Sequence, residues 1–288
     1  MAVEDSATRE DLILTLSCPD QPGIVHAVSE IIVSQDGNII QSQQFGDPDT
    51  GLFFMRVELE SPQGRAPIIA AMEDFADKFD ATWDLDQRGR ALRTVIMVSR
   101  EGHCLTDLLY RQRYAQLPIE VVAVIGNHPD LAPVAQFYGK PFLCIPVSKD
   151  TKEAAETELL NLIRAENVEL VVLARYMQIL SDALCQELAG NVINIHHSFL
   201  PSFKGARPYA QAHDRGVKLI GATAHYVTAD LDEGPIIEQD VTRVTHRNST
   251  RDLVAEGQDV ERRVLAQAVK WHAEHRVLLN GHRTVVFS

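Results

Sequence analysis

The chain has 288 residues, a 45% apolar fraction and a formal charge of −13 at neutral pH. This length allows one large domain or two ordinary ones, and the composition is that of a globular protein. The acidic balance argues against nucleic acid as a partner, because a phosphate backbone needs a basic surface. No apolar run reaches the length of a membrane-spanning helix, so no membrane segment is expected.

The cysteines and the N-terminus both point to the cytoplasm. Cys18, Cys104, Cys144 and Cys185 are far apart in the sequence, which favours free thiols over disulfides or a metal site. Residues 1–6 are acidic and lack the basic and apolar regions of a signal peptide. We therefore expect a cytoplasmic protein.

The acidic charge is concentrated in the first third of the chain. Residues 1–90 carry 6 basic and 17 acidic side chains, a net charge of −11, whereas the remainder has a net charge of −2. This asymmetry predicts two units. We expect domains at 1–88 and 93–288, joined by a polar linker within 84–93.

The first unit is predicted to alternate strands and helices. Strands are expected at 11–18, 39–45, 52–59 and near 81–83. Helices are expected at 24–34 and from Pro67 to Phe79. The resulting order, βαββαβ, is the ferredoxin-like arrangement.

The second unit is predicted to be an α/β domain. Short apolar strands are expected at 92–99, 120–126, 142–146, 170–174, 192–195, 222–227, 235–240 and 284–287. Helices are expected at 104–113, 151–166 and 250–275. Such alternation predicts a Rossmann-like, mostly parallel sheet with helices on both faces.

Polar residues with catalytic potential follow one of these strands. Asn194 and His196 alternate along a predicted strand end, so they face the same side. Asp232 stands in Leu231-Asp232-Glu233-Gly234-Pro235, a loop sequence. Taken singly, each residue has an ordinary structural explanation as a turn, cap or packed side chain. Together, an amide, an imidazole and a carboxylate suffice to attack a carbonyl and move its protons.

These motifs resemble a known family. Asn194-Ile195-His196 with the Asp232 loop, together with flanking runs at 197–201, 205–209 and 221–226, is similar to the formyltransferase domains that use 10-formyltetrahydrofolate. Residues 8–88 resemble an ACT domain. The combination resembles the formyltetrahydrofolate deformylases, which hydrolyse that folate to formate and tetrahydrofolate.

The resemblance implies site residues. It assigns catalysis to Asn194, His196 and Asp232, and leaves open how His196 and Asp232 divide the proton transfers. It implies pterin binding by the backbone of the segment after the strand at 170–174, with further contributions from the loops near Asp232. The implied substrate-binding residues are Met177, Ile179, Leu180, His225 and Asp230.

The ACT-like unit implies regulation and assembly. Asp20, Gly23 and Ile24 lie between a strand and a helix, where a glycine lets the backbone approach a ligand and a helix N-terminus attracts a carboxylate. The resemblance implies a small amino-acid effector, glycine or methionine, and a homo-oligomer, either a dimer or a tetramer. A turn with a helix cap and no ligand is the alternative.

One departure distinguishes a hydrolase from a transferase. Glycinamide ribonucleotide formyltransferases carry a glycine-rich turn that cradles phosphate after the first strand of this domain. This chain instead has Glu101-Gly102-His103-Cys104, in which Glu101 would repel a phosphate, and His103 and Cys104 are expected to pack at a helix start. If no acceptor amine enters, water can take its place. The alternatives are formyl transfer to a small amine and a non-catalytic folate or amino-acid sensor.

No metal and no permanently bound cofactor are expected. His196 and His197 are neighbours on a strand, so their side chains point to opposite faces and do not readily bind one ion. The usual zinc spacings are absent from the sequence.

Overall fold

The computed structural model describes residues 9–198 and 208–288, which form two compact units. Unit 1 combines the chain up to Arg90 with Glu274–Ser288, and unit 2 is Ala91–Ala273. Unit 2 is therefore inserted between two parts of unit 1. The expected second domain, 93–288, is corrected at its C-terminal end, where residues 274–288 pack with unit 1 instead.

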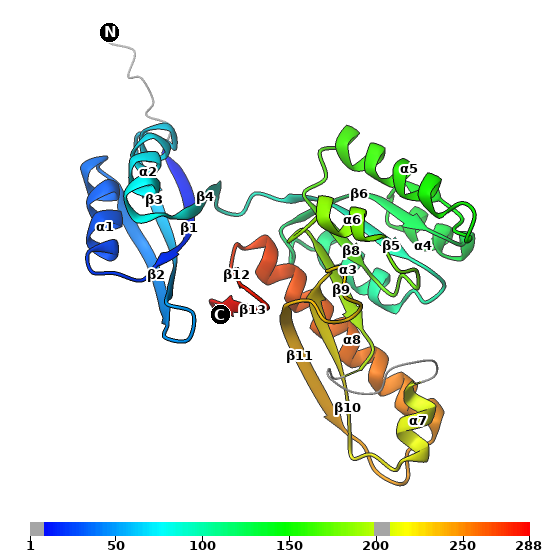
Figure 1. Cartoon of the computed structure of the whole chain (residues 1–288). Coiled ribbons are helices and arrows are strands. Elements are labelled where there is room, and N and C mark those ends of the chain that lie inside the picture. The colour runs from blue at the N-terminus through cyan, green and yellow to red at the C-terminus, as the bar shows by residue number, and fades with distance from the viewer. Residues whose placement is uncertain (1–8, 199–207) are drawn as a thin grey trace. The chain divides into compact units, whose positions relative to one another are not determined.

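Unit 1 has the predicted βαββαβ core. It comprises β1 (Glu10–Pro19), α1 (Ile24–Ser34), β2 (Asn38–Asp47), β3 (Leu52–Ser61), α2 (Ala66–Phe79) and β4 (Thr82–Gln87). The sheet is antiparallel in the order β2-β3-β1-β4, with both helices on one face (Figure 1). Alternating leucines of β1 (Leu12, Leu14 and Leu16) are buried against this helical layer. Because β4 continues to Gln87, the linker is shorter than the polar sequence predicts.

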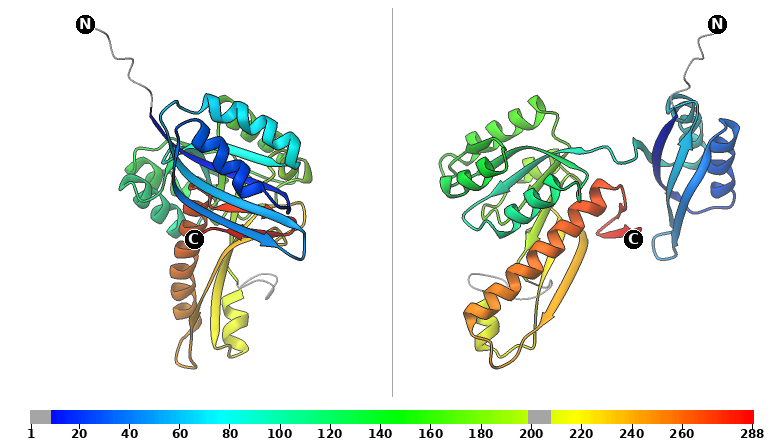
Figure 2. Two further views of the ribbon diagram at one scale, coloured as in Figure 1. Left: turned by 90° about the vertical axis from the view of Figure 1, so that its left-hand side faces the viewer. Right: turned by 180° about the vertical axis from the view of Figure 1, so that it is seen from behind.

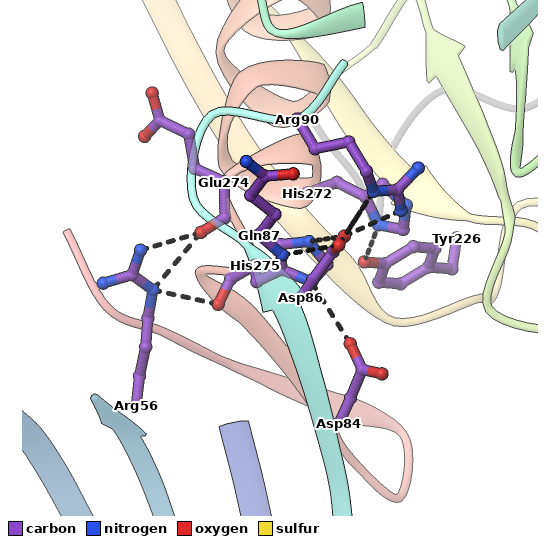
Figure 3. Close-up of polar contacts among 9 residues, drawn as sticks. All are labelled: Arg56, Asp84, Asp86, Gln87, Arg90, Tyr226, His272, Glu274 and His275. Carbon is purple, nitrogen blue, oxygen red and sulfur yellow. Dashed lines mark hydrogen bonds and ion pairs between the residues drawn. The ribbon is translucent and has the colours of Figure 1, made fainter. Parts of the chain in front are cut away.

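A C-terminal hairpin completes unit 1. It consists of β12 (Val277–Asn280) and β13 (Arg283–Val286). The Arg56 side chain is 1% exposed and donates hydrogen bonds to the backbone carbonyls of Glu274, at 2.9 Å, and His275, at 3.1 Å (Figure 3). Asn280 donates to Asp47 at 2.6 Å. These bonds explain the packing of residues 274–288 with unit 1.

Unit 2 is built on a seven-stranded sheet in the order β11-β10-β9-β8-β5-β6-β7. The strands are β5 (Leu92–Val98), β6 (Ile119–Gly126), β7 (Phe142–Cys144), β8 (Leu170–Leu173), β9 (Val192–His196), β10 (Leu219–Tyr226) and β11 (Ile236–Arg243). Strands β5 to β9 are parallel, and β10 and β11 are antiparallel additions. The expected mostly parallel α/β sheet is confirmed.

Helices flank this sheet (Figures 1 and 2). They are α3 (His103–Arg113), α4 (Ala132–Phe137), α5 (Lys152–Ala165), α6 (Asp182–Glu187), α7 (Pro208–Asp214) and α8 (Thr250–Ala273), with a 3₁₀ turn η1 (Pro129–Leu131). The short helices α4, α6 and α7 were not predicted, because six or seven residues give too few turns for a periodic apolar pattern. Among the described residues, no helix combines the length and apolarity needed to cross a membrane.

The strand order defines where a ligand would bind. From β5 the chain moves outwards through β6 and β7, and then returns to β8 on the other side of β5. Open α/β sheets bind ligands at such a reversal, beyond the carboxyl ends of the strands. The loops after β5 and β8, and the end of β9 beside them, are therefore the expected site.

We predict that Arg56→Met releases the C-terminal hairpin from unit 1. The substitution keeps an apolar stem but removes the guanidinium that donates to two partly buried carbonyls, a loss of about 3 kcal/mol in local stability. Hydrogen–deuterium exchange should accelerate across β12 and β13. Arg164→Met is the control, because Arg164 is 64% exposed and pairs only at the surface with Glu187. Unchanged exchange in β12 and β13 would show that Arg56 does not hold the hairpin.

Candidate active site

A cavity of about 240 Å³ opens beyond the carboxyl ends of β8 and β9. Its walls are the segment after β8, the end of β9 and the loop after β10. Seven of the predicted site residues line it: Met177, Ile179, Leu180, Asn194, His196, His225 and Asp232. Asp230 is not among the lining residues; its side chain is exposed, and its carbonyl accepts bonds from Thr228 and Glu233.

Strand alternation directs the β9 side chains. Asn194 and His196 both line the cavity, as the period of two along a strand predicts. Ile193 is fully buried, whereas Ile195 is buried but also contributes to the cavity wall.

Asp232 is held by a tightly built loop. Its φ of +57° lies in the left-handed region, which is unfavourable for a residue with a Cβ atom. Gly234 is required beside it, because an added Cβ would lie 1.8 Å from the carbonyl oxygen of Tyr226. The Tyr226 N–H donates to the Pro235 carbonyl at 2.9 Å, which fixes the loop to the end of β10. The Asp-Glu-Gly-Pro sequence thus serves to place one carboxylate.

Two histidines hold the Asp232 carboxylate. His196 Nδ1 lies 3.2 Å from Asp232 Oδ2, and His225 Nε2 lies 3.7 Å from Asp232 Oδ1. The hydrogen bond from His196 is the largest effect that holds the pKa of Asp232 far below its usual range, despite partial burial. Asp232 is therefore an anion and a very weak base.

His225 also supports Asn194. Its Nδ1–H donates to the Tyr226 carbonyl at 2.8 Å, so in the neutral ring Nε2 carries the lone pair. That lone pair accepts a hydrogen bond from Asn194 Nδ2 at 3.2 Å. Since an amide nitrogen has two hydrogens, one remains for a ligand. His196 Nε2 is buried and has no hydrogen-bond partner within the described ranges.

The segment after β8 presents apolar side chains. Met177 and Ile179 are exposed, whereas Leu180 is buried. The Met177 N–H is already engaged, because it donates to Ser99 Oγ at 2.9 Å. Of the Met177 backbone groups, only the carbonyl therefore remains to accept a hydrogen bond from the edge of a substrate ring. Ser99, at 4% exposure, was not predicted; its position directly after the central strand β5 was the available signal.

His197 is a second histidine in the cavity wall. Its ring stacks on that of His196, with centroids 5.1 Å apart and an interplanar angle of 27°. Burial, followed by the charges of Arg175 and His196, lowers the pKa of His197 to about 4. His197 is therefore neutral at physiological pH. We did not predict that the adjacent residues His196 and His197 would both line one cavity, because in an ideal strand their side chains point to opposite faces.

One group of described residues has ligand atoms at metal-binding spacing. Atoms of His103, Cys104 and Glu261 lie within 4.8 Å of one another. Burial, followed by the charge of Glu261, raises the pKa of the Cys104 thiol well above its usual value. Arg175 Nε also lies 3.4 Å from the Glu261 carboxylate, where it competes with any cation. The electrostatics therefore do not favour a metal here.

The predicted effector residues lie between β1 and α1 in unit 1. Gly23 has a φ of +97° at the N-terminus of α1, a conformation that favours glycine. The Ile24 side chain is 2% exposed and packs in the core, so only its backbone could meet a ligand. Asp20 is exposed. Of the flanking runs that carry the family resemblance, residues 199–201 and 205–207 lie outside the described residues.

Comparisons with known proteins agree with this architecture. A formyl transferase family model matches residues 92–269, and an ACT domain model matches residues 12–77. A formyltetrahydrofolate deformylase of Corynebacterium sp. (strain P-1) is 52% identical over 277 residues, which cover 95% of this chain and 97% of that protein.

Solved structures extend the likeness. The crystal structure of formyltetrahydrofolate deformylase from Burkholderia mallei ATCC 23344 is 46% identical, has a TM-score of 0.94, and covers 97% of this chain and 100% of that chain. Glycinamide ribonucleotide transformylase 1 from Symbiobacterium toebii is 30% identical with a TM-score of 0.65, over 71% of this chain and 98% of that one. The two units, the shared site and the near-complete coverage together place this chain in the formyltetrahydrofolate deformylase family.

Proposed function

We propose that unit 2 hydrolyses 10-formyltetrahydrofolate to formate and tetrahydrofolate, and that Asn194, His196 and Asp232 carry the chemistry. The supporting observation is the convergence of these three side chains on one open cavity. The opposite wall carries the exposed apolar side chains of Met177 and Ile179, which suit a flat ring system. Folate is the substrate, with no resident cofactor or metal, and formate supply for purine synthesis is the proposed role.

The charges assign the roles. Asp232 is too weak a base to take a proton from water, so it orients His196 through Nδ1 and stabilises the imidazolium. His196 Nε2 takes the proton as water attacks the formyl carbon. The free amide hydrogen of Asn194 holds the developing oxyanion. His196 then protonates the leaving nitrogen, the C–N bond breaks, and formate departs.

Unit 1 is proposed as the regulatory and oligomerisation unit. The N-terminus of α1 has free backbone N–H groups for a carboxylate, and Asp20 supplies an anion for an ammonium group. Glycine or methionine is the proposed effector. Ile40 and Phe45 on the edge strand β2 are exposed, which suits pairing into a homo-oligomer, a dimer or tetramer, measurable by light scattering. We propose that the enzyme works in the cytoplasm.

Asp232→Asn and His196→Ala should each lower formate release from 10-formyltetrahydrofolate by at least about a hundredfold, because each removes part of the proton-transfer machinery. Steady-state formate production, with a circular dichroism check of folding, measures this. His213→Ala is the control histidine, since its side chain is 44% exposed on α7. Near-normal rates in a folded variant would remove that residue from the mechanism.

The same assay distinguishes the alternatives. Formate without an added amine supports the hydrolase, and formyl transfer to an added amine supports a transferase. Folate binding without turnover supports a sensor.

The pH dependence follows from the lowered pKa of Asp232. A depressed pKa keeps the carboxylate ionised at every pH above it, so Asp232 does not titrate between pH 5 and 8. A carbon-13 NMR titration of the side-chain carboxyl groups, with Asp232→Asn to assign the Asp232 signal, should therefore show no protonation of Asp232 between pH 5 and 8. Protonation of that carboxyl within the interval would show that Asp232 titrates with an ordinary or raised pKa.

An effector response should depend on the β1–α1 loop. We expect glycine or methionine to change the rate of formate release in the wild type. Asp20→Ala should abolish that response without changing the basal rate. Asp36→Ala, at an exposed acidic residue beyond α1, is the matched control. An unchanged response in Asp20→Ala would move the effector elsewhere.

A further inference from the structure

A buried ion cluster lies beside the catalytic residues of unit 2. Its centre is Glu261 on α8, which is 1% exposed. The carboxylate accepts hydrogen bonds from His103 Nε2 at 2.8 Å and from the Tyr209 hydroxyl at 2.6 Å. Arg175 Nε lies 3.4 Å away, and Glu101 Oε1 lies 3.8 Å from Arg175 Nη2. We call these five residues the Glu261 cluster.

Building this cluster lowers stability at several points. Gly257 lies within α8, where glycine costs about 1 kcal/mol relative to alanine. An added Cβ there would be 2.1 Å from the Tyr209 hydroxyl oxygen, so the glycine makes room for the bond to Glu261. Arg175 has a φ of +64°, and its Nε and Nη1 atoms are buried without hydrogen-bond partners in the described part of the chain. Apolar packing would be more stable, so this arrangement points to a function.

The charged groups of the cluster are paired with one another. Although burial opposes ionisation, the hydrogen bond from His103 and the charge of Arg175 lower the pKa of Glu261. Arg175 thus faces one buried carboxylate and the partly exposed Glu101. An anion would meet these two acids, and a cation would meet the guanidinium. The cluster is therefore better suited to filling space than to binding an ion.

Its position decides what it fills. Glu101 and His103 follow β5, and Arg175 follows β8, so the cluster occupies the crevice where the strand order reverses. Arg175 also lines the catalytic cavity, as does His197. The His197 ring stacks on that of His196, and its centroid lies 6.3 Å from that of Tyr209. The cluster is thus the wall directly behind the catalytic histidine.

We propose that the Glu261 cluster determines the nucleophile: it closes the side from which an amine acceptor would approach the formyl carbon, so that water reacts instead. This rests on the proposed hydrolysis. With the wall open, an amine nitrogen would attack the formyl carbon, the bond from that carbon to the folate nitrogen would break, and the folate nitrogen would receive the proton that the amine loses. The products would be an N-formyl amine and tetrahydrofolate.

Tyr209 gives a graded test. Tyr209→Phe removes only the hydrogen bond to Glu261, whereas Tyr209→Ala also opens space behind His197. The full-length protein is incubated with 10-formyltetrahydrofolate and glycinamide, and formate and N-formylglycinamide are quantified by mass spectrometry. We expect formate alone from wild type, and a ratio of formylated amine to formate that rises at least about tenfold in Tyr209→Ala, with Tyr209→Phe between them.

Tyr226→Phe is the matched control. This tyrosine is also buried and its hydroxyl bonds an α8 side chain, His272 Nδ1 at 2.8 Å, but it lies outside the cluster (Figure 3). Its product ratio should equal that of wild type. A general loosening of the fold would lower both products together and leave their ratio unchanged, and thermal melts report that loosening separately.

The outcomes separate the two claims. Formate release with a product ratio that is the same in all four proteins would overturn the role of the cluster while leaving the hydrolase intact. The same ratio increase in Tyr226→Phe as in Tyr209→Phe would also overturn it. Absence of formate from wild type would overturn the proposed function and, with it, this inference.

Discussion

The proposed catalytic arrangement depends on one interaction: the Asp232 carboxylate lies against His196 Nδ1, with His225 on its other side. A strained loop, made possible by Gly234, brings this carboxylate to the end of β9. Because the anion is so strongly stabilised, its proposed role is to orient an imidazole and balance its charge. Asn194 joins the same network through His225, so the proposed proton carrier and the proposed oxyanion donor are both positioned around one carboxylate. The remainder of unit 2 positions these groups around a cavity.

Stability and function are in tension around this site. Asp232 and Arg175 both adopt left-handed backbone conformations, and Glu261 is an ionised group in the interior. Each is unfavourable for folding alone, and all lie at or beside the cavity. Unit 1 also uses a buried arginine, Arg56, but there the charge has a structural task, since it binds the backbone that follows α8.

Much of the fold was predictable from local patterns. Apolar strands such as β6 and β8, and the periodic helix α2, can each be predicted from their own short stretch of sequence. Alternation along β9 predicted that Asn194 and His196 share one side, whereas the resemblance to the formyltransferase family implied that Asp232 joins them. The segment 274–288 was misplaced, because residues distant in the sequence, such as Arg56 and Asp47, hold it against unit 1. The Glu261 cluster could not be predicted in this way. It brings together Glu261, Tyr209 and Arg175 from three separate segments, and no local sequence pattern predicts contacts of that kind.

The central claim is that the formyl-bearing nitrogen of the substrate lies against His196. A crystal structure with a stable reduced-folate analogue bound tests this most directly. The account predicts the pterin ring along Met177 and Ile179, and the nitrogen that carries the formyl group within about 3 Å of His196 Nε2 or one water away. An analogue seated elsewhere, with no room for a formyl group between Asn194 and His196, would contradict it.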